Sequence, residues 1–383
     1  MDSVLTFPRA VFREDHEMFR DTVRRFLERE CKPRQAQWDE DGKVDRETWL
    51  KAGREGLLCT AIGEEWGGSG GDFGHSAIVQ EELAYSGISG PGFSLHSDII
   101  APYIERLGTD DQKRKWLPRC ATGEVILAVA MSEPGAGSDL KAIRTTARRE
   151  GDEYVIQGAK TFISNGLNCD LVVVVAKTAP ELGGKGVSLI LVEADRPGFR
   201  RGRKLDKMGQ EAADTAEMFF DDVRVPVSNL LGEENKGFGY LMQELAQERF
   251  MIAVSAAAKL EAMLAETIRY TRERVVFGKP LFDFQNTRFK LAEIKARTTA
   301  VRMLVDTYMA QHMERRLKLE EAAVAKLYST EELGRSLDEL LQLYGGYGYM
   351  KEYPICRAFI DSRVNRIYGG TSEVMKELIS RSL

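Results

Sequence analysis

The spacing of apolar and polar positions changes twice along the chain. In its first third, apolar residues recur at intervals of three and four with charged residues between them, as in the segment 18–27. This is the spacing of an amphipathic helix. Turns containing Gly or Pro separate several further helical stretches, among them residues 76–85, 97–106 and 110–120. We therefore expect an N-terminal helical domain over residues 1–122.

After residue 123 the pattern becomes a series of short β-branched and aromatic runs bounded by Gly, Asn, Asp and Pro. These runs occupy residues 125–131, 154–157, 171–177, 187–193 and 217–220. Such runs are typical of a small all-β unit of roughly 100 residues, which we expect over residues 123–232. The alternation of strands with long helices that marks a dinucleotide-binding domain is missing.

Helical spacing returns after residue 232, in long stretches over residues 238–270, 286–314 and 320–344. Helices of about 25 residues or more are about twice the average length. They suit an antiparallel bundle, expected over residues 233–383. The order helical, β, helical predicts an α+β fold.

Composition and charge exclude several classes of protein. The 383 residues are 43% hydrophobic and 30% charged, which is ordinary for a globular protein. Lys and Arg number 54 against 59 Asp and Glu, and a net charge of −5 argues against a nucleic-acid partner. The longest apolar runs, at 171–176 and 187–192, are far too short to cross a membrane.

Cysteines, histidines and the first residues bear on metal binding and location. Five scattered cysteines without CxxC spacing predict buried free thiols in a reducing compartment. The four histidines are dispersed in the sequence, so we expect no metal site. Charges at Arg9, Arg13, Glu14 and Asp15 do not fit a targeting segment, and the sequence predicts a cytoplasmic protein.

Common nucleotide and nucleophile motifs give no lead. Neither GxGxxG nor GxxxxGK[ST] occurs. GGSGG at residues 67–71 fits GxSxG formally, but no strand precedes it, so Ser69 is not expected to be a nucleophile. The basic run RRGRK at 200–204 either attracts an anionic substrate or is a solvated loop, and we favour the loop.

Two segments of the β unit have a more specific composition. MSEPGAGSD at 131–139 follows a predicted strand and turns through Pro and two glycines. Its backbone N–H groups and the hydroxyls of Ser132 and Ser138 suit a polar planar ligand, although a plain strand-exit turn has the same features. The second segment is KTFISNG at 160–166.

Together with three later segments, these resemble the acyl-CoA dehydrogenase family. The later segments are RERVVFGKP at 272–280 followed by Gln285, QLYGGYGY at 342–349 and RIYGGTSE at 366–373. All five occur in the family's order, and the resemblance covers essentially the whole chain. It implies a helical N-terminal domain, a middle β-barrel or sandwich and a C-terminal four-helix bundle. It also implies a homotetramer that binds FAD across a subunit interface and passes electrons to an electron-transfer flavoprotein.

The resemblance also assigns expected site residues. FAD is expected to contact Met131, Ser132, Phe162, Ser164, Gln342, Gly346, Thr371 and Glu373, and the FAD of a neighbouring subunit is expected to contact Arg274, Phe277 and Gln285. Ser138 and Arg249 are expected near the CoA portion of an acyl-CoA substrate. The backbone N–H of Gly369 is expected to hold the thioester carbonyl, and Tyr368 to line the acyl pocket.

The residue at position 369 raises the question of the catalytic base. Many family members carry there the glutamate that removes the substrate's α-proton, and Gly369 cannot do so. Either the base has moved or this chemistry is lost. Glu248, next to Arg249, resembles the base of the long-chain and isovaleryl types. Glu244 is a second candidate, and Glu244 with Glu248 also fits a solvated acidic pair on one helix face.

The sequence therefore predicts α,β-desaturation of a fatty acyl-CoA to the trans-2-enoyl-CoA, with Glu248 as base and FAD as hydride acceptor. Because Gly369 frees space beside the reacting carbons, long or branched acyl chains are the expected substrates. A flavin oxidase or monooxygenase on the same fold is the alternative. A non-catalytic helical interaction protein is the third interpretation.

Overall fold

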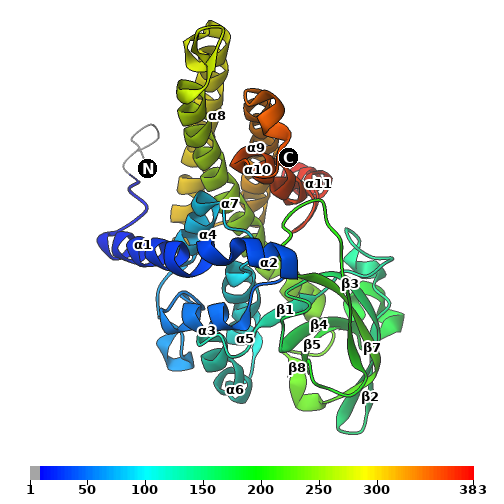
Figure 1. Ribbon diagram of the computed structural model, residues 1–383. Helices are drawn as coiled ribbons and strands as arrows, with labels where there is room; N and C mark the ends of the chain where they lie inside the picture. The colour runs from blue at the N-terminus through cyan, green and yellow to red at the C-terminus, as the bar shows by residue number, and fades with distance from the viewer. Residues whose placement is uncertain (1–8) are drawn as a thin grey trace.

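The computed structural model describes residues 9–383 (Figure 1). Residues 1–8, the start of the first expected helical domain, lie outside the described residues. The first helices are α1 (Glu14–Phe26), α2 (Gln35–Asp41), α3 (Arg46–Arg54), α4 (Phe73–Ser86), α5 (Ala101–Leu107) and α6 (Asp110–Ala121). Side chains fix their starts: Asp45 accepts a hydrogen bond from the backbone N–H of Thr48 at α3, and Thr109 caps α6.

The starts of α1 and α4 lie side by side and bring His16 and His75 together. The centroids of the two imidazole rings are 4.4 Å apart, although the two histidines are far apart in the sequence. The backbone N–H groups of Arg13 and Asp72 donate to the Nδ1 atoms of His16 and His75, respectively. His16 Nε2 lies 2.7 Å from a carboxylate oxygen of Asp72. The two histidines thus serve as caps of two helices.

Eight strands form the middle part of the chain. They are β1 (Leu127–Ala130), β2 (Thr146–Glu150), β3 (Glu153–Ser164), β4 (Leu171–Lys177), β5 (Val187–Glu193), β6 (Phe199–Lys204), β7 (Thr215–Pro226) and β8 (Leu230–Leu231). Their order in the sheet is β6-β7-β3-β2-β4-β5-β8, with β1 paired in parallel to β4. Strands β4 and β5 are apolar and buried along almost their whole length, which places the core of this part around them.

The basic run 200–204 lies in this sheet, so the prediction of a loop there is wrong. It is most of β6, an edge strand, where Arg200 pairs with Phe219 of β7 and Arg201 pairs with Met218. Backbone pairing needs no apolar side chains, and charges on an edge strand prevent pairing with a further chain. Sequence reasoning missed the charged strand β2 for the same reason.

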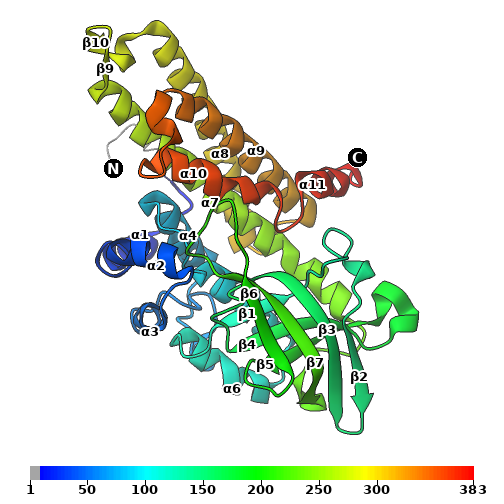
Figure 2. The same cartoon turned by 45° about the vertical axis from the view of Figure 1, so that its right-hand side comes forward.

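The last part of the chain is helical. Its elements are α7 (Gly237–Glu273), the short strands β9 (Val275–Val276) and β10 (Lys279–Pro280), α8 (Gln285–Met313), α9 (Leu319–Gln342), α10 (Pro354–Ser362) and α11 (Ser372–Ser380). The three long helices α7, α8 and α9 lie along one another, and α10 packs on α7 and α9 (Figures 1 and 2). The α+β fold class, with helical units on both sides of a β unit, is confirmed.

The two helical parts share one core and a buried ion-pair network. Phe73 and Ala77 of α4 pack in the same cluster as Phe250 and Val254 of α7. On α4, the Glu81 carboxylate lies 2.7 Å from the Arg302 guanidinium of α8 and also contacts Arg9 and Arg20. These contacts therefore fix the C-terminal helices, α7 among them, against the N-terminal helices. No helix within residues 9–383 combines the length and the apolar character that traversing a bilayer requires.

Candidate active site

A left-handed turn just before α11 is the centre of the candidate site. Gly369 and Gly370 have φ values of +61° and +97°, which residues with side chains rarely adopt. The ammonium of Lys326 on α9 donates to the carbonyls of Tyr368, at 2.6 Å, and Gly370. Arg249 on α7 donates from Nε to the carbonyl of Gly369 at 3.2 Å. Two cations thus hold three consecutive carbonyl oxygens.

Glu248 of α7 lies directly against this turn. A Cβ added at Gly369 would be 3.3 Å from Glu248 Oε1 and 2.7 Å from Ile252 Cδ1. Burial raises the pKa of Glu248, and the nearby charges of Arg249 and Lys326 lower it, with a raised pKa as the net result. A half-buried carboxylate with a raised pKa, beside the position of a missing side chain, is suited to accept a proton.

Two further polar groups close to Glu248 have no partner among the described residues. Arg249 is 4% exposed, and its Nη1 makes no hydrogen bond. The hydroxyl of the buried Tyr103, on α5, also has none. Burial raises the pKa of Tyr103, and the negative charge of Glu248 adds to this effect. Buried donors of this kind are normally satisfied, so both are available for a ligand or an ordered water.

Glu244 has a different environment from Glu248. It is 7% exposed, and the guanidinium of Arg106 on α5 lies 2.7 Å from its carboxylate. The interpretation of Glu244 and Glu248 as a solvated acidic pair is therefore wrong. Glu244 makes an ion pair with Arg106 instead.

The segments 131–139 and 160–166 are joined by a buried lysine. The Lys160 ammonium donates to the carbonyl of Met131 at 3.0 Å and to the Glu133 carboxylate at 2.9 Å. The backbone N–H of Thr161 donates to the carbonyl of Ser132 at 3.0 Å. Burial lowers the pKa of Lys160 to about 8, and Glu133 opposes this shift. The two segments, separate in the sequence, therefore form one fixed surface.

Phe162 projects from that surface at a bulge. The pairing of β3 with β7 is interrupted between Lys160 and Ile163, and Phe162 has a φ of +59°. A left-handed φ is costly for a residue with a side chain, and Phe162 is 69% exposed. Ser164, two residues later, is also exposed. An exposed aromatic ring beside a hydroxyl suits the face and edge of a planar ring system.

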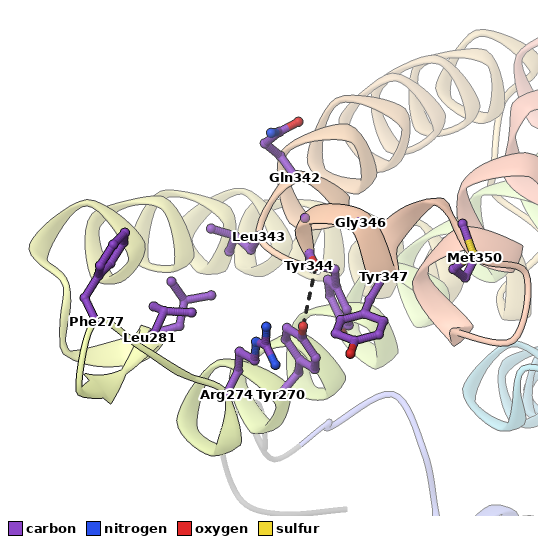
Figure 3. A pocket seen from close by; sticks show the side chains of 12 residues that line it. Tyr270, Arg274, Phe277, Leu281, Gln342, Leu343, Tyr344, Gly346, Tyr347 and Met350 are labelled. Carbon is purple, nitrogen blue, oxygen red and sulfur yellow. Dashed lines mark hydrogen bonds between the residues drawn. The ribbon is translucent and has the colours of Figure 1, made fainter.

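A second candidate binding surface is a cavity of about 600 Å³ at the other end of α7 (Figure 3). It is lined by Tyr270, Arg274, Val276, Phe277, Leu281, Gln342, Leu343, Tyr344, Gly345, Gly346, Tyr347 and Met350. It brings together four predicted residues, Arg274, Phe277, Gln342 and Gly346. Phe277 is 97% exposed. The predicted Gln285 does not line the cavity and begins α8.

The other predicted residues lie apart from the cavity. Thr371 caps α11 by accepting a hydrogen bond from the backbone N–H of Val374, and Glu373 is exposed in the first turn of that helix. Tyr368 donates from its hydroxyl to Asn365 at 2.8 Å. Ser138 is exposed in the loop that follows β1. Tyr368 alone of these four adjoins Gly369.

Sequence reasoning did not identify Lys326, Tyr103 or Lys160 as site residues. One signal in the sequence could have identified Lys326. It is a charged residue on the face of a helix whose other positions, such as Ala323, Ala325 and Leu333, are apolar and buried. A buried lysine needs a specific partner. The partner carbonyl of Tyr368 is 42 residues away, so no local pattern reveals it.

Comparison with known proteins gives matches over nearly the whole chain. Family models described as the acyl-CoA dehydrogenase N-terminal, middle and C-terminal domains match residues 13–124, 128–223 and 235–383. The chain belongs to the acyl-CoA dehydrogenase family. The enzyme is accordingly an oxidoreductase acting on acyl-CoA, and the predicted family is confirmed.

Three relatives illustrate the match. The long-chain specific acyl-CoA dehydrogenase, mitochondrial, of Mus musculus is 49% identical over 98% of this chain and 88% of that protein. An acyl-CoA dehydrogenase structure from Geobacillus kaustophilus has a TM-score of 0.95 at 47% identity, covering 98% and 99% of the two chains. A chain described under "Electron transferring flavoprotein of Acidaminococcus fermentans" has a TM-score of 0.91 at 35% identity, covering 100% and 99%.

Proposed function

We propose that this enzyme is an FAD-dependent acyl-CoA dehydrogenase that converts a long-chain or branched acyl-CoA to the trans-2-enoyl-CoA, with Glu248 as the base. The contact between Glu248 and the turn at Gly369 carries the proposal. It supplies a carboxylate within 3.3 Å of the Cβ position from which other family members present theirs.

The residues around the turn have complementary roles in this reaction. Glu248 takes the α-proton. Because its pKa is raised, the difference in pKa between this base and the weakly acidic α-carbon is smaller. The backbone N–H of Gly369 donates to the thioester carbonyl and stabilises the negative charge that develops there. Arg249 holds the carbonyl of Gly369 and keeps the turn in its left-handed conformation.

The two surfaces described above fit the two ends of FAD. Phe162 and Ser164 lie at the end of β3, which Lys160 joins to the segment 131–139, and they suit the isoalloxazine ring, with Met131 and Ser132 beside them. In the cavity at the end of α7, a Cβ at Gly345 or Gly346 would meet no atom within 4 Å, so the turn is open to phosphates, and Arg274 supplies a positive charge. When bound, FAD supplies the acceptor for the β-hydrogen as hydride and transfers electrons to an electron-transfer flavoprotein.

The position of these two surfaces supports an FAD site shared between subunits. The strands β9 and β10, next to the cavity, lie at the far end of the helices from β3 (Figure 2). This separation supports binding of each FAD between two copies of the chain, one supplying the surface at Phe162 and the other supplying the cavity. We propose the homotetramer of the family for this reason. We propose that Thr371 and Glu373, at the start of α11, and Gln285, at the start of α8, also contact FAD.

Substrate and location rest on separate observations. Glycine at 369 leaves free space beside the reacting carbons, which supports long or branched acyl chains, with Tyr368 in the acyl pocket and Ser138 and Arg249 towards CoA. Five buried free cysteines support a reducing compartment. We propose the cytoplasm, while the mouse relative is by its name mitochondrial.

The test is anaerobic mixing of the FAD-loaded enzyme with palmitoyl-CoA while the visible spectrum is recorded. Bleaching of the flavin band is the expected result. A flavin band that persists with straight and branched acyl-CoAs alike would overturn the proposed function. Reoxidation of bleached enzyme by air faster than by an electron-transfer flavoprotein would favour an oxidase instead.

A further inference from the structure

We propose that Lys326 is a positioning residue for this reaction. It places a positive charge on the peptide group between Tyr368 and Gly369, whose N–H holds the thioester carbonyl, and beside the carboxylate of Glu248, the base. This inference rests on the proposed function and assigns a role to a residue of α9 that does not itself contact the reacting atoms.

The first part of the inference comes from one peptide group. Lys326 is 1% exposed and donates to the carbonyl oxygen of Tyr368 at 2.6 Å. That oxygen and the N–H of Gly369 belong to the same peptide unit. An ionised donor on the oxygen withdraws electron density from the nitrogen, so the N–H becomes a stronger donor on its opposite side. Through this polarisation, Lys326 strengthens the hydrogen bond to the thioester carbonyl without contacting the thioester.

The second part concerns the neighbouring peptides. Lys326 also donates to the carbonyl of Gly370, and Arg249 donates to the carbonyl of Gly369 between them. All three carbonyl oxygens of the turn are therefore held by cations, while Gly369 and Gly370 have left-handed φ values. This fixes the direction of the Gly369 N–H, since rotation of that peptide would break the bond from Lys326.

The third part is the relationship to the base. The Cβ position of residue 369 lies 3.7 Å from Lys326 Cε and 3.3 Å from Glu248 Oε1, so the two side chains flank one point. The charged groups acting on Lys326 are Glu248 and Arg249 of α7, and Tyr368 is the titratable side chain of the turn. Positive charge next to Glu248 favours its ionised, proton-accepting form.

A purely structural role would not require a charge. Fixing two carbonyls needs only neutral donors, and a buried ammonium is costly. Burial lowers the pKa of Lys326 to about 8, with Glu248 opposing the shift. The presence of lysine despite that cost supports a role for its charge.

The test compares Lys326→Gln, which keeps a hydrogen-bond donor without the charge, with Lys326→Met, which keeps neither, and Lys326→Arg, which keeps both. Flavin reduction by palmitoyl-CoA is expected to slow by at least about tenfold in the Gln and Met variants. This loss is expected to be smaller than the loss of about 10²–10³-fold that follows removal of an oxyanion donor itself. The acid limb of the rate's pH profile is expected to move to higher pH in both, and the Arg variant to recover part of the rate.

A second readout needs no turnover. In 3-thiapalmitoyl-CoA sulfur replaces the β-carbon, so no hydride leaves, and a ¹³C label at the thioester carbonyl makes its infrared stretch visible. The bound stretch is expected at lower frequency in the wild type and nearer to the free value in Lys326→Gln. Lys259→Met is the matched control. Lys259 is also a lysine of the helical bundle, on α7, but the charges near it are those of Asp361 and Arg357 and not that of Glu248.

The outcomes separate this inference from the proposed function. A wild type whose flavin is not bleached by any acyl-CoA would contradict the proposed function. A wild type that is bleached, with a Lys326→Gln variant of unchanged rate, pH profile and carbonyl stretch, would overturn the inference alone. If Lys326→Met does not fold, the Gln and Arg variants, checked by melting temperature and FAD content, decide the question.

Discussion

Glu248 Oε1 lies 3.3 Å from the point at which residue 369 would carry its Cβ. A carboxylate on α7 and a side chain on the turn therefore compete for the same space. Glycine at 369 and glutamate at 248 therefore depend on each other, because the absence of a side chain at 369 leaves room for the carboxylate from the neighbouring helix.

The first prediction concerns Gly369→Ala. The methyl group would overlap Ile252 Cδ1, 2.7 Å from the Cβ position, and the φ of +61° would be strained. We expect the free energy of unfolding to fall by about 1–2 kcal/mol from the backbone strain alone, and flavin reduction to slow. Adding Ile252→Val, which removes Cδ1, should restore the steric part only. A stable and fully active Gly369→Ala single variant would contradict this account.

The second prediction compares two glutamates one helical turn apart. Glu248→Gln should retain FAD and acyl-CoA binding and lose about 10²–10⁴-fold in the rate of flavin reduction, as expected for loss of a general base. Stopped-flow absorbance under anaerobic conditions measures this rate. Glu244→Gln is the control, since Glu244 pairs with Arg106, and should stay within about tenfold of the wild type. The reverse ranking would make Glu244 the base.

The third prediction concerns the cavity at the end of α7. Arg274→Met should weaken FAD binding by about 10–100-fold, because it removes a charged donor from the cavity lining. Equilibrium dialysis of FAD gives the dissociation constant. Arg272→Met removes a guanidinium from the same segment, where it lies 5.0 Å from the Phe282 ring centroid. Equal losses in both variants would show that net charge, and not the cavity, accounts for the effect.

The fourth prediction concerns stability and pH. Burial raises the pKa of Glu81, but the guanidinium groups of Arg9, Arg302 and Arg20 outweigh this and leave the pKa well below its usual range. A depressed carboxyl pKa stabilises the fold above the unfolded-state value of about 4.3, and that contribution is lost as the pH falls below it. Wild-type melting temperature should therefore drop more steeply in acid than that of Glu81→Gln.

At neutral pH the same Glu81→Gln substitution should lower the free energy of unfolding by about 3 kcal/mol or more, because buried guanidinium groups lose their partner. Glu17→Gln is the control: Glu17 is exposed and pairs with Arg20 at 3.1 Å, so its loss should cost less than about 1 kcal/mol. Thermal unfolding monitored by circular dichroism measures both.

Much of the fold was predictable because its long elements have regular apolar spacing. The expected helix over 238–270 corresponds to Gly237–Glu273, and the run 171–177 is β4. Strands β2 and β6 were not predicted, since their charged side chains obscure a pairing made by backbone groups. The short helices α10 and α11 each follow a glycine-rich turn and have too few residues for a clear period.

The candidate site was predictable only where its residues lie in compact motifs. Phe162 lies in such a motif, but its left-handed φ does not follow from its residue type, since phenylalanine rarely adopts it. Lys326 contacts Tyr368 across 42 residues, and Arg249 contacts Gly369 across 120. Contacts of this length depend on how the helices pack, which no local spacing records.

Glu248 lies within helix α7, and Arg274 directly follows the last residue of that helix. At about 1.5 Å per residue, the two positions are about 39 Å apart along the helix axis. If the FAD site is shared as proposed, each subunit gives its base to one catalytic centre and its arginine to another. Subunits that carry Glu248→Gln and subunits that carry Arg274→Met, each defective alone, would then complement one another. In a mixed pair, one centre receives both defects and the other receives neither, so activity returns on assembly.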